Sequence, residues 1–260
     1  MPSPAHTPHS DSHVHTPLCA HAVGSMEEYV LAAIARGLEE LVFLEHMEEG
    51  IDSPRKTWLS EEDFDLYFAE GQRLQRLYGK KLRIGLGVEC GYNSASRQAL
   101  LIRLAARKWT QIGISCHFLL LQEGAGHLNL FSRHPENIAI AREFGIDHVL
   151  EAYFATLTEA VQTLPGSKVC HLDGALRFLP DVRLTNHHYA QIEHLLKEMA
   201  ARGIALEVNT SGLTIRGEQF PCRRILEMAK GINLDLVFGS DAHRPEDVAG
   251  HFPEILSRLP

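Results

Sequence analysis

The chain has 260 residues, of which 45% are apolar and 22% charged, and its net charge is -8. This length is ample for one α/β barrel with a real core, and no apolar run approaches the roughly 18 residues of a membrane span. There is no dense block of lysine and arginine. Together these features argue against a nucleic-acid binder and a membrane protein, and they favour work on a small molecule.

The first residues, MPSPAHTPHS, are rich in proline, serine and histidine and show no periodicity. We therefore predict a loose tail over residues 1–10 and a single domain over residues 11–260. The tail has neither a basic nor an apolar stretch, so no signal peptide is expected and a cytoplasmic location is the default prediction. The five cysteines show no CxxC spacing, which predicts free thiols.

Short β-rich runs alternate with helical patterns along the rest of the chain. Seven runs predict strands, most of them apolar on both faces as buried parallel strands are: 11–15, 40–46, 82–90, 111–119, 168–173, 204–211 and 234–243. Ser25 with Glu28, and Ser60 with Asp63, predict capping boxes at the starts of two intervening helices. Two further helices are predicted over 186–203 and 221–231, the second with Pro221 in its first turn.

Seven β/α units without an internal repeat of fixed period fit a barrel better than an open sheet. We therefore predict a single-domain α/β fold, a seven-stranded relative of the TIM barrel. In such barrels the chemistry lies at the carboxyl ends of the strands. The side chains at those ends are therefore the candidate functional residues.

Histidines and carboxylates occupy almost every predicted strand end. His13 and His15 are two residues apart, so they share one face of the first strand, about 6.6 Å apart along it, and can bind one ion. Asp241 and His243 form a second pair of this kind. The other candidates are His46, Glu89, His117 and His171 at four further strand ends and His21 in the loop after the first strand. Glu45 and His46 must face opposite ways, and we take His46 as the inward residue.

Seven histidines and two carboxylates are too many ligands for one ion. Mixed imidazole and carboxylate donors suit zinc, iron or manganese, whereas calcium or magnesium would take mostly oxygen. Two metals that share a bridging carboxylate, or three metals, match this number of ligands. A lone histidine at a strand end is more commonly a hydrogen-bonded core residue, but chance would have to fill six strand ends of seven.

The remaining histidines and cysteines give weaker signals. Cys19 lies in the same loop as His21, and as a thiolate it would be a good zinc ligand, so its role stays open. Cys116 and Cys170 each precede a predicted ligand, and strand alternation predicts that they point away from the barrel interior. Structural or surface positions are predicted for His127, His134, His148, His187, His188, His194 and His251.

The motifs DSHVHTPLCAHA, LEH, GVECGY, SCHFL, CHLD, LEVNTSGL and FGSDAHRPEDVA occur in this order between about residues 11 and 255. With this set the chain resembles the PHP superfamily of metallohydrolases, named for polymerases and histidinol phosphatases, and within it the histidinol-phosphatase branch. The resemblance implies a distorted (β/α)7 barrel with a trinuclear metal site.

The resemblance also implies how the ligands divide among the metals. One metal would be held by His13, His15, Glu89 and Asp241; Glu89 would bridge to a second held by His117 and His171; a third would be held by His21, His46 and His243. The family commonly has aspartate where this chain has Glu45. The longer acid either supports a ligand or plays no part.

The implied activity is hydrolysis of a small phosphate monoester, with L-histidinol phosphate as the leading substrate, to L-histidinol and phosphate in histidine biosynthesis. Two or three divalent ions (Zn, Fe or Mn) would lower the pKa of water to give the attacking hydroxide, so no side-chain nucleophile and no general acid are assigned. Arg177, Arg216 and Asn209, which follow or end the fifth and sixth strands, are predicted to contact the phosphate.

Two other functions stay open at this point. The first is a PHP phosphoesterase acting on nucleotides or short oligonucleotides, which the acidic balance and the lack of a basic groove disfavour. The second is a non-catalytic metal-binding domain, which the full set of ligand positions disfavours. The sequence sets no oligomeric state.

Overall fold

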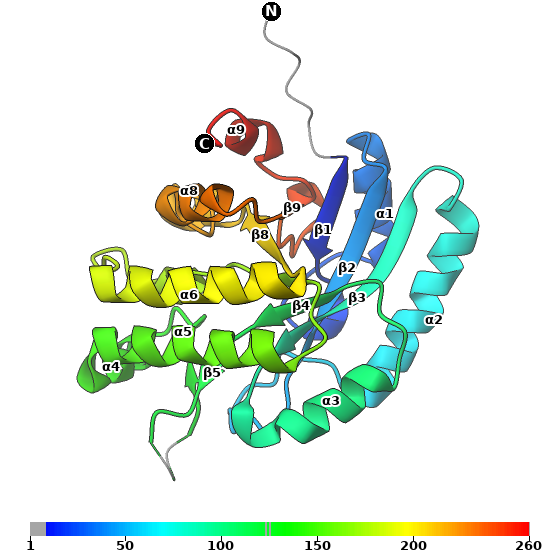
Figure 1. Cartoon of the computed structure of the whole chain (residues 1–260). Helices are drawn as coiled ribbons and strands as arrows, with labels where there is room; N and C mark the ends of the chain where they lie inside the picture. Colours follow the sequence, from blue (N-terminus) through cyan, green and yellow to red (C-terminus); the bar gives the residue numbers. More distant parts are fainter. Residues whose placement is uncertain (1–8, 123, 125, 260) are drawn as a thin grey trace, which may run out of the picture.

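Seven parallel strands form one sheet in a computed structural model that describes residues 9–122, 124 and 126–259 (Figure 1). The strands run β1 (Ser10–Val14), β2 (Glu40–Met47), β3 (Arg83–Gly91), β4 (Ile112–Ser115), β7 (Lys168–Val169), β8 (Ala205–Asn209) and β9 (Leu236–Gly239), and neighbours in this list are hydrogen-bonded. Each strand thus pairs with the next parallel strand along the chain. Most are apolar on both faces because helices cover them outside and the barrel interior lies within.

The sheet closes on itself between β1 and β9. An isolated parallel bridge joins Val14 to Ala242, just beyond β9, and the Asp241 N–H donates to the His13 carbonyl at 2.8 Å. The predicted seven-stranded barrel is therefore confirmed. Residues 1–8 of the predicted tail lie outside the described residues, and Ser10 already belongs to β1.

The buried carboxylate of Asp11 strengthens this closure. It accepts hydrogen bonds from the Ser240 N–H (2.9 Å), the Ser240 hydroxyl (2.5 Å) and the Ala249 N–H (2.7 Å). These donors lie beyond β9, whereas Asp11 lies on β1. One side chain therefore satisfies three polar groups across the line where the barrel closes.

Helices form the outer layer of the barrel (Figure 1). They are α1 (Met26–Ala35), α2 (Glu61–Tyr78), α3 (Arg97–Ala105), α4 (Pro135–Phe144), α5 (Ile146–Thr163), α6 (Asn186–Arg202), α7 (Gly212–Arg216), α8 (Arg223–Gly231) and α9 (Phe252–Leu256). The capping boxes predicted at Ser25 and Ser60 are both present. Pro221 lies outside α8, which begins at Arg223. Within the described ranges, no helix combines the length and apolar character needed to cross a membrane.

Four predicted strands are shorter in the structure, and the sixth, predicted over 204–211, spans Ala205–Asn209. The run 111–119 divides into β4 and β5 (Phe118–Leu119), and β5 pairs antiparallel with β6 (Leu128–Asn129) in a separate small sheet. The fifth and seventh strands end early, at Val169 and Gly239. His171 (φ 30°) and Asp241 (φ 55°) follow them with left-handed backbones, which an extended strand cannot contain.

Cys170 shows the consequence of this early ending. It packs with Val42 and Leu44 in a small cluster inside the barrel, and a Cβ on Gly113 would lie 2.5 Å from its sulfur. The prediction that Cys170 points away from the interior is therefore wrong, because strand alternation does not extend past Val169. Cys116 does lie in the large core cluster, and all five cysteines are free.

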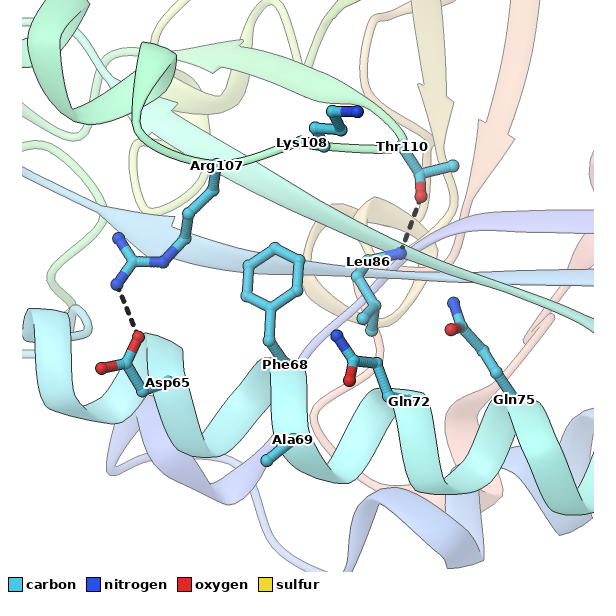
Figure 2. A pocket seen from close by; sticks show the side chains of 9 residues that line it. All are labelled: Asp65, Phe68, Ala69, Gln72, Gln75, Leu86, Arg107, Lys108 and Thr110. Carbon is cyan, nitrogen blue, oxygen red and sulfur yellow. Dashed lines mark hydrogen bonds and ion pairs between the residues drawn. The ribbon is translucent and has the colours of Figure 1, made fainter.

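A groove of about 550 Å³ lies on the outside of the barrel between α2 and the segment 107–110 (Figure 2). Arg107 pairs with Asp65 across it at 2.9 Å, and the Thr110 hydroxyl accepts from the Leu86 N–H at 3.0 Å. None of the predicted metal or phosphate ligands lines this groove. The site described below is elsewhere, at the carboxyl ends of the strands.

The closure of the barrel can be tested by replacing Asp11 with alanine. The variant leaves the donors of Ser240 and Ala249 without their buried acceptor, so its free energy of unfolding should fall by about 3 kcal/mol. Urea unfolding of the metal-free protein measures this loss. The control is S10A, which removes a half-buried hydrogen bond on the same strand and should cost less than about 1 kcal/mol; equal losses in the two variants would contradict the account.

Candidate metal centre

All nine predicted metal ligands meet at the carboxyl end of the barrel. His13 lies on β1 with His15 just after it, His21 in the following loop, His46 on β2, Glu89 on β3, His117 after β4, His171 after β7, and Asp241 and His243 after β9. Ligand atoms of seven of these residues fall within 4.8 Å of one another in the overlapping groups His13–His15–Asp241, His15–His46–Glu89 and His21–His46–His243, and His117 and His171 join them through Glu89. The structure therefore brings the whole predicted set together.

The carboxylate of Glu89 lies at the centre of the cluster and is fully buried. Its Oε1 is 3.1 Å from His117 Nε2 and 2.7 Å from His171 Nε2. Its Oε2 is 2.9 Å from His46 Nδ1 and 3.4 Å from His13 Nε2. Burial raises the pKa of Glu89, but the surrounding histidines outweigh it and hold that pKa well below the ordinary value. Glu89 is thus an anion whose two oxygens face different histidine groups, as a bridging ligand requires.

The first group lies between β1 and β9. His13 Nε2 and His15 Nε2 face each other at 3.0 Å, and Asp241 Oδ1 lies 3.2 Å from the second of them. Burial raises the pKa of Asp241, yet its hydrogen bond with His15 and the charge of His13 keep that pKa well below normal. This group therefore combines two imidazoles with an ionised carboxylate.

Another group consists of the three histidines His21, His46 and His243, and it is the most open to solvent. His21 Nε2 and His243 Nε2 are 2.8 Å apart, and the His46 ring lies 5.3 Å from the His21 ring between centroids. Burial together with the charge of His15 lowers the pKa of His243 to about 3. It also lowers the pKa values of His21 and His46. These rings are neutral at pH 7, as metal ligands must be.

In four of these histidines, the Nδ1 atom has a hydrogen-bond acceptor of its own, while Nε2 faces the other candidate ligands. The Nδ1 atoms of His21 and His243 meet the carbonyls of Cys19 and Asp241 at 2.8 and 2.9 Å. The Nδ1 atoms of His13 and His117 meet the carboxylates of Glu207 and Glu48, both at 2.7 Å. Acceptors at Nδ1 place the proton there and leave Nε2 free to bind a metal, so these outer groups fix the useful tautomer.

Glu207 and Glu48 are candidate functional residues that the sequence analysis missed. A signal was available for both, because each lies two residues from a predicted site residue on the same strand or its extension: Glu207 before Asn209 and Glu48 after His46. Side chains two apart on a strand share one face. Each carboxylate is buried, with 0% and 3% of its surface exposed.

Glycines on neighbouring strands give these two carboxylates room. A Cβ on Gly91 would lie 2.0 Å from Glu48 Oε1, and a Cβ on Gly239 would lie 2.6 Å from Glu207 Oε1. Any side chain at either position would have to displace the carboxylate. The absence of a side chain at the ends of β3 and β9 is therefore part of the site.

The donor set fits divalent cations. Two pairs of imidazole nitrogens face each other at 3.0 and 2.8 Å beside buried carboxylates, and the buried Glu89 Oε2 makes no hydrogen bond within the described chain. Cations between these atoms would satisfy all of them. Nitrogen and carboxylate donors together suit zinc, iron or manganese.

The sequence left open the roles of two side chains beside this site, Cys19 and Glu45. The Cys19 sulfur is 3.9 Å from His21 Nε2 and buried, and burial with the nearby Glu45 raises the pKa of the thiol to about 12. Glu45 accepts a hydrogen bond from the Thr16 N–H, and its other oxygen lies 3.9 Å from His15 Nδ1. Glu45 therefore supports the chain around His15. The Cys19 carbonyl holds His21, and the Cys19 sulfur lies within 4.8 Å of ligand atoms of His15 and His243, so Cys19 stays a candidate metal ligand.

The three predicted phosphate contacts differ in their surroundings. Arg177 Nη2 donates to Ser211 Oγ at 3.0 Å and to Asp241 Oδ2 at 3.3 Å, so its guanidinium borders the metal ligands. Arg216 instead donates to the carbonyls of residues 176 and 179, which flank Arg177. The amide of Asn209 donates from Nδ2 to Glu207 Oε2 and accepts at Oδ1 from the N–H and hydroxyl of Ser211. These contacts favour Arg177 as a phosphate contact, and the contacts of Arg216 and Asn209 with the phosphate stay predictions.

A (β/α)7 barrel with clustered histidines and a buried central carboxylate at its carboxyl end has the architecture of a candidate polynuclear metalloprotein. The family model described as the PHP domain matches residues 11–211, and the chain belongs to this family. The family predicted from the sequence is thus confirmed.

Similar proteins match almost the whole chain. The "Probable histidinol-phosphatase" of Deinococcus radiodurans is 30% identical over 255 residues, covering 96% of this chain and 92% of that protein. The "Histidinol-phosphatase" of Bacillus subtilis is 25% identical over 265 residues, covering 95% and 98%.

Solved structures share the fold. A Listeria monocytogenes protein, described as a candidate histidinol phosphatase, superposes with a TM-score of 0.86 at 21% identity and covers 94% of this chain and 99% of that one. The Lactococcus lactis histidinol phosphate phosphatase, solved with zinc, L-histidinol and phosphate, has a TM-score of 0.75 at 21% identity and covers 96% and 92%.

The role of Glu48 can be tested without touching a predicted ligand. The variant G91A places a methyl group where the Glu48 carboxylate lies, so His117 should lose its partner and the affinity for its metal should fall about 10-fold to 100-fold. Chelator competition with zinc measures this change. The control G231A adds a methyl group in open space near the end of α8 and should bind zinc as the parent does. Unchanged affinity in G91A would rule out a role for Glu48.

Proposed function

We propose that this chain is a metal-dependent phosphatase that hydrolyses L-histidinol phosphate to L-histidinol and phosphate, a step of histidine biosynthesis. The observation that carries the proposal is the convergence of seven histidines with Glu89 and Asp241 at the mouth of a PHP barrel. The full-length relatives named for this activity support the substrate. A cytoplasmic location and the absence of nucleic-acid binding remain predictions.

The proposed ligand sets follow the groups of the site. His13, His15, Glu89 and Asp241 hold one ion, Glu89 bridges to a second ion on His117 and His171, and His21, His46 and His243 hold a third. The distances of both Glu89 oxygens to histidine nitrogens support a bridging role. Two or three divalent ions of zinc, iron or manganese are therefore expected per chain.

Divalent ions bound to this set would lower the pKa of a water and neutralise the phosphate dianion, which are the two requirements of monoester hydrolysis. The protein supplies the fixed arrangement. Burial of Glu89 and Asp241 keeps both carboxylates out of water. Glu207 and Glu48 orient His13 and His117 through their Nδ1 atoms, so little reorganisation is needed when substrate binds.

Arg177 supplies the fixed cation for the phosphate. Its guanidinium lies over the rings of Phe131 and Phe220, with its central carbon 5.5 and 5.6 Å from the two centroids. These contacts and the hydrogen bond to Ser211 hold the guanidinium beside Asp241. A forked donor held rigidly at the edge of the metal ligands suits a phosphate oxygen.

Substrate choice can be tested with the purified, metal-loaded protein. Phosphate release from L-histidinol phosphate should exceed release from p-nitrophenyl phosphate by at least roughly tenfold in kcat/KM, because a site built for one substrate binds its transition state better. Nucleoside bisphosphates serve as the second comparison. Higher activity on the bisphosphates would favour a nucleotide phosphoesterase, and no activity with any substrate at full metal loading would contradict the phosphatase proposal.

Arg177 and Arg216 form a matched pair for a second test. R177M removes the cation beside Asp241 and should lower kcat/KM by roughly a hundredfold while the metal content stays the same. R216M should cost clearly less, because this guanidinium holds the chain around Arg177 and not the phosphate. Steady-state kinetics with histidinol phosphate measures both, and an equal or larger loss in R216M would reverse the assignment.

A further inference from the structure

A lysine side chain lies inside the barrel beneath the metal centre. Lys168, the first residue of β7, has 1% of its surface exposed, although lysine is among the residues least often fully buried. Burying an ammonium without partners is very costly, so its contacts must compensate for the lost water. None of the mechanistic roles assigned above uses this residue.

Lys168 contacts two residues that adjoin His13. Its Nζ donates to the Ser12 carbonyl at 2.7 Å and to the Ser12 hydroxyl at 2.8 Å, and it pairs with Glu207 Oε1 at 3.1 Å. Ser12 is the residue directly before His13 in the chain. Glu207 Oε1 is also the atom that meets His13 Nδ1 at 2.7 Å. The ammonium thus contacts both the backbone next to His13 and the partner of its ring.

Contacts at both carboxylate oxygens fix the orientation of the Glu207 side chain. Its second oxygen accepts from Asn209 Nδ2 and from the His171 N–H, both at 3.1 Å. The carboxylate is therefore fixed by a lysine, an amide, a main-chain N–H and a histidine. Removing Lys168 would leave the His13 imidazole as the one remaining partner of Glu207 Oε1 among these contacts.

The same place has the donors of a cation site. His13, Cys170 and Glu207 have ligand atoms within 4.8 Å of one another. The ion pair of Lys168 with Glu207 puts an ammonium in this group. We interpret this group as the position that the Lys168 ammonium occupies and not as a further metal site.

We propose that Lys168 is a positioning residue of the metal centre, which holds the His13 imidazole in place from inside the barrel through Glu207 and Ser12. The inference rests on the proposed role of His13 as a metal ligand. It does not depend on the identity of the substrate. A side chain outside the ligand set thereby contributes to the binding of the ion that His13 holds.

The test is the zinc affinity of K168M, which keeps a long side chain and removes the charge and the donors. Chelator competition and elemental analysis of the full-length protein should show one ion per chain bound at least tenfold more weakly, with the remaining ions unchanged. Burial lowers the pKa of metal-free His13, but Glu207 and Glu89 outweigh it and hold that pKa well above its ordinary value. At a pH high enough to make this ring neutral, the ¹⁵N spectrum of the metal-free protein should show a smaller share of the Nδ1–H tautomer for His13. Zinc affinity within twofold of the parent, with an unchanged tautomer, would overturn the proposal.

Two further variants separate positioning from general loss of stability. V161A removes buried packing on the outer helix α5 and leaves Lys168, Ser12 and Glu207 in place, so it should lose thermal stability but keep its zinc affinity. If K168M does not fold, S12A decides the question, because it removes one acceptor of the ammonium and keeps the rest. S12A should bind one ion several-fold more weakly, and unchanged affinity would overturn the proposal.

A double variant tests the route through Glu207. E207Q and K168M/E207Q should lose similar affinity, because Lys168 acts mainly through that carboxylate. Fully additive losses would overturn this route. These measurements need no substrate, so a protein that binds zinc as described but does not hydrolyse histidinol phosphate would refute the proposed function and leave this inference standing.

Discussion

The structure depends on one electrostatic constraint, the burial of Glu89 among histidines at the centre of the barrel mouth. A buried carboxylate is stable only when cations or donors surround it. Both oxygens of Glu89 face imidazole nitrogens that come from four different strands or strand ends. The barrel supplies this convergence, since parallel strands bring their carboxyl ends to one place.

Several local features serve the same constraint. His171 and Asp241 have left-handed backbones, a conformation that costs of order 1–3 kcal/mol for residues other than glycine and is found mainly at functional sites. Gly91 and Gly239 leave the space that Glu48 and Glu207 occupy. Inside the barrel, Lys168 pairs with Glu207, so the charges extend from the metal ligands into the core.

The sequence predicted the barrel and the convergence of the candidate ligands because both have short-range signals. Pairs such as His13 and His15 depend only on strand alternation, and capping boxes such as that of Ser25 depend on four consecutive residues. Cys170 was misplaced because nothing local showed that β7 ends at Val169. Lys168 was missed because its importance depends on contacts with residues far away in the chain. Glu48 and Glu207 share a strand face with His46 and Asn209, but only the structure shows that they meet His117 and His13. Arg216 was placed by strand order alone, which does not reveal that its guanidinium turns toward carbonyls.

The central claim is that these residues form one polynuclear centre bridged by Glu89. Anomalous diffraction at the zinc absorption edge, on crystals of the zinc-loaded protein, tests it most directly. The account predicts at least two zinc peaks that share Glu89, one bound by His13, His15 and Asp241 and the other by His117 and His171. A single peak, or peaks that leave Glu89 without a metal, would contradict it.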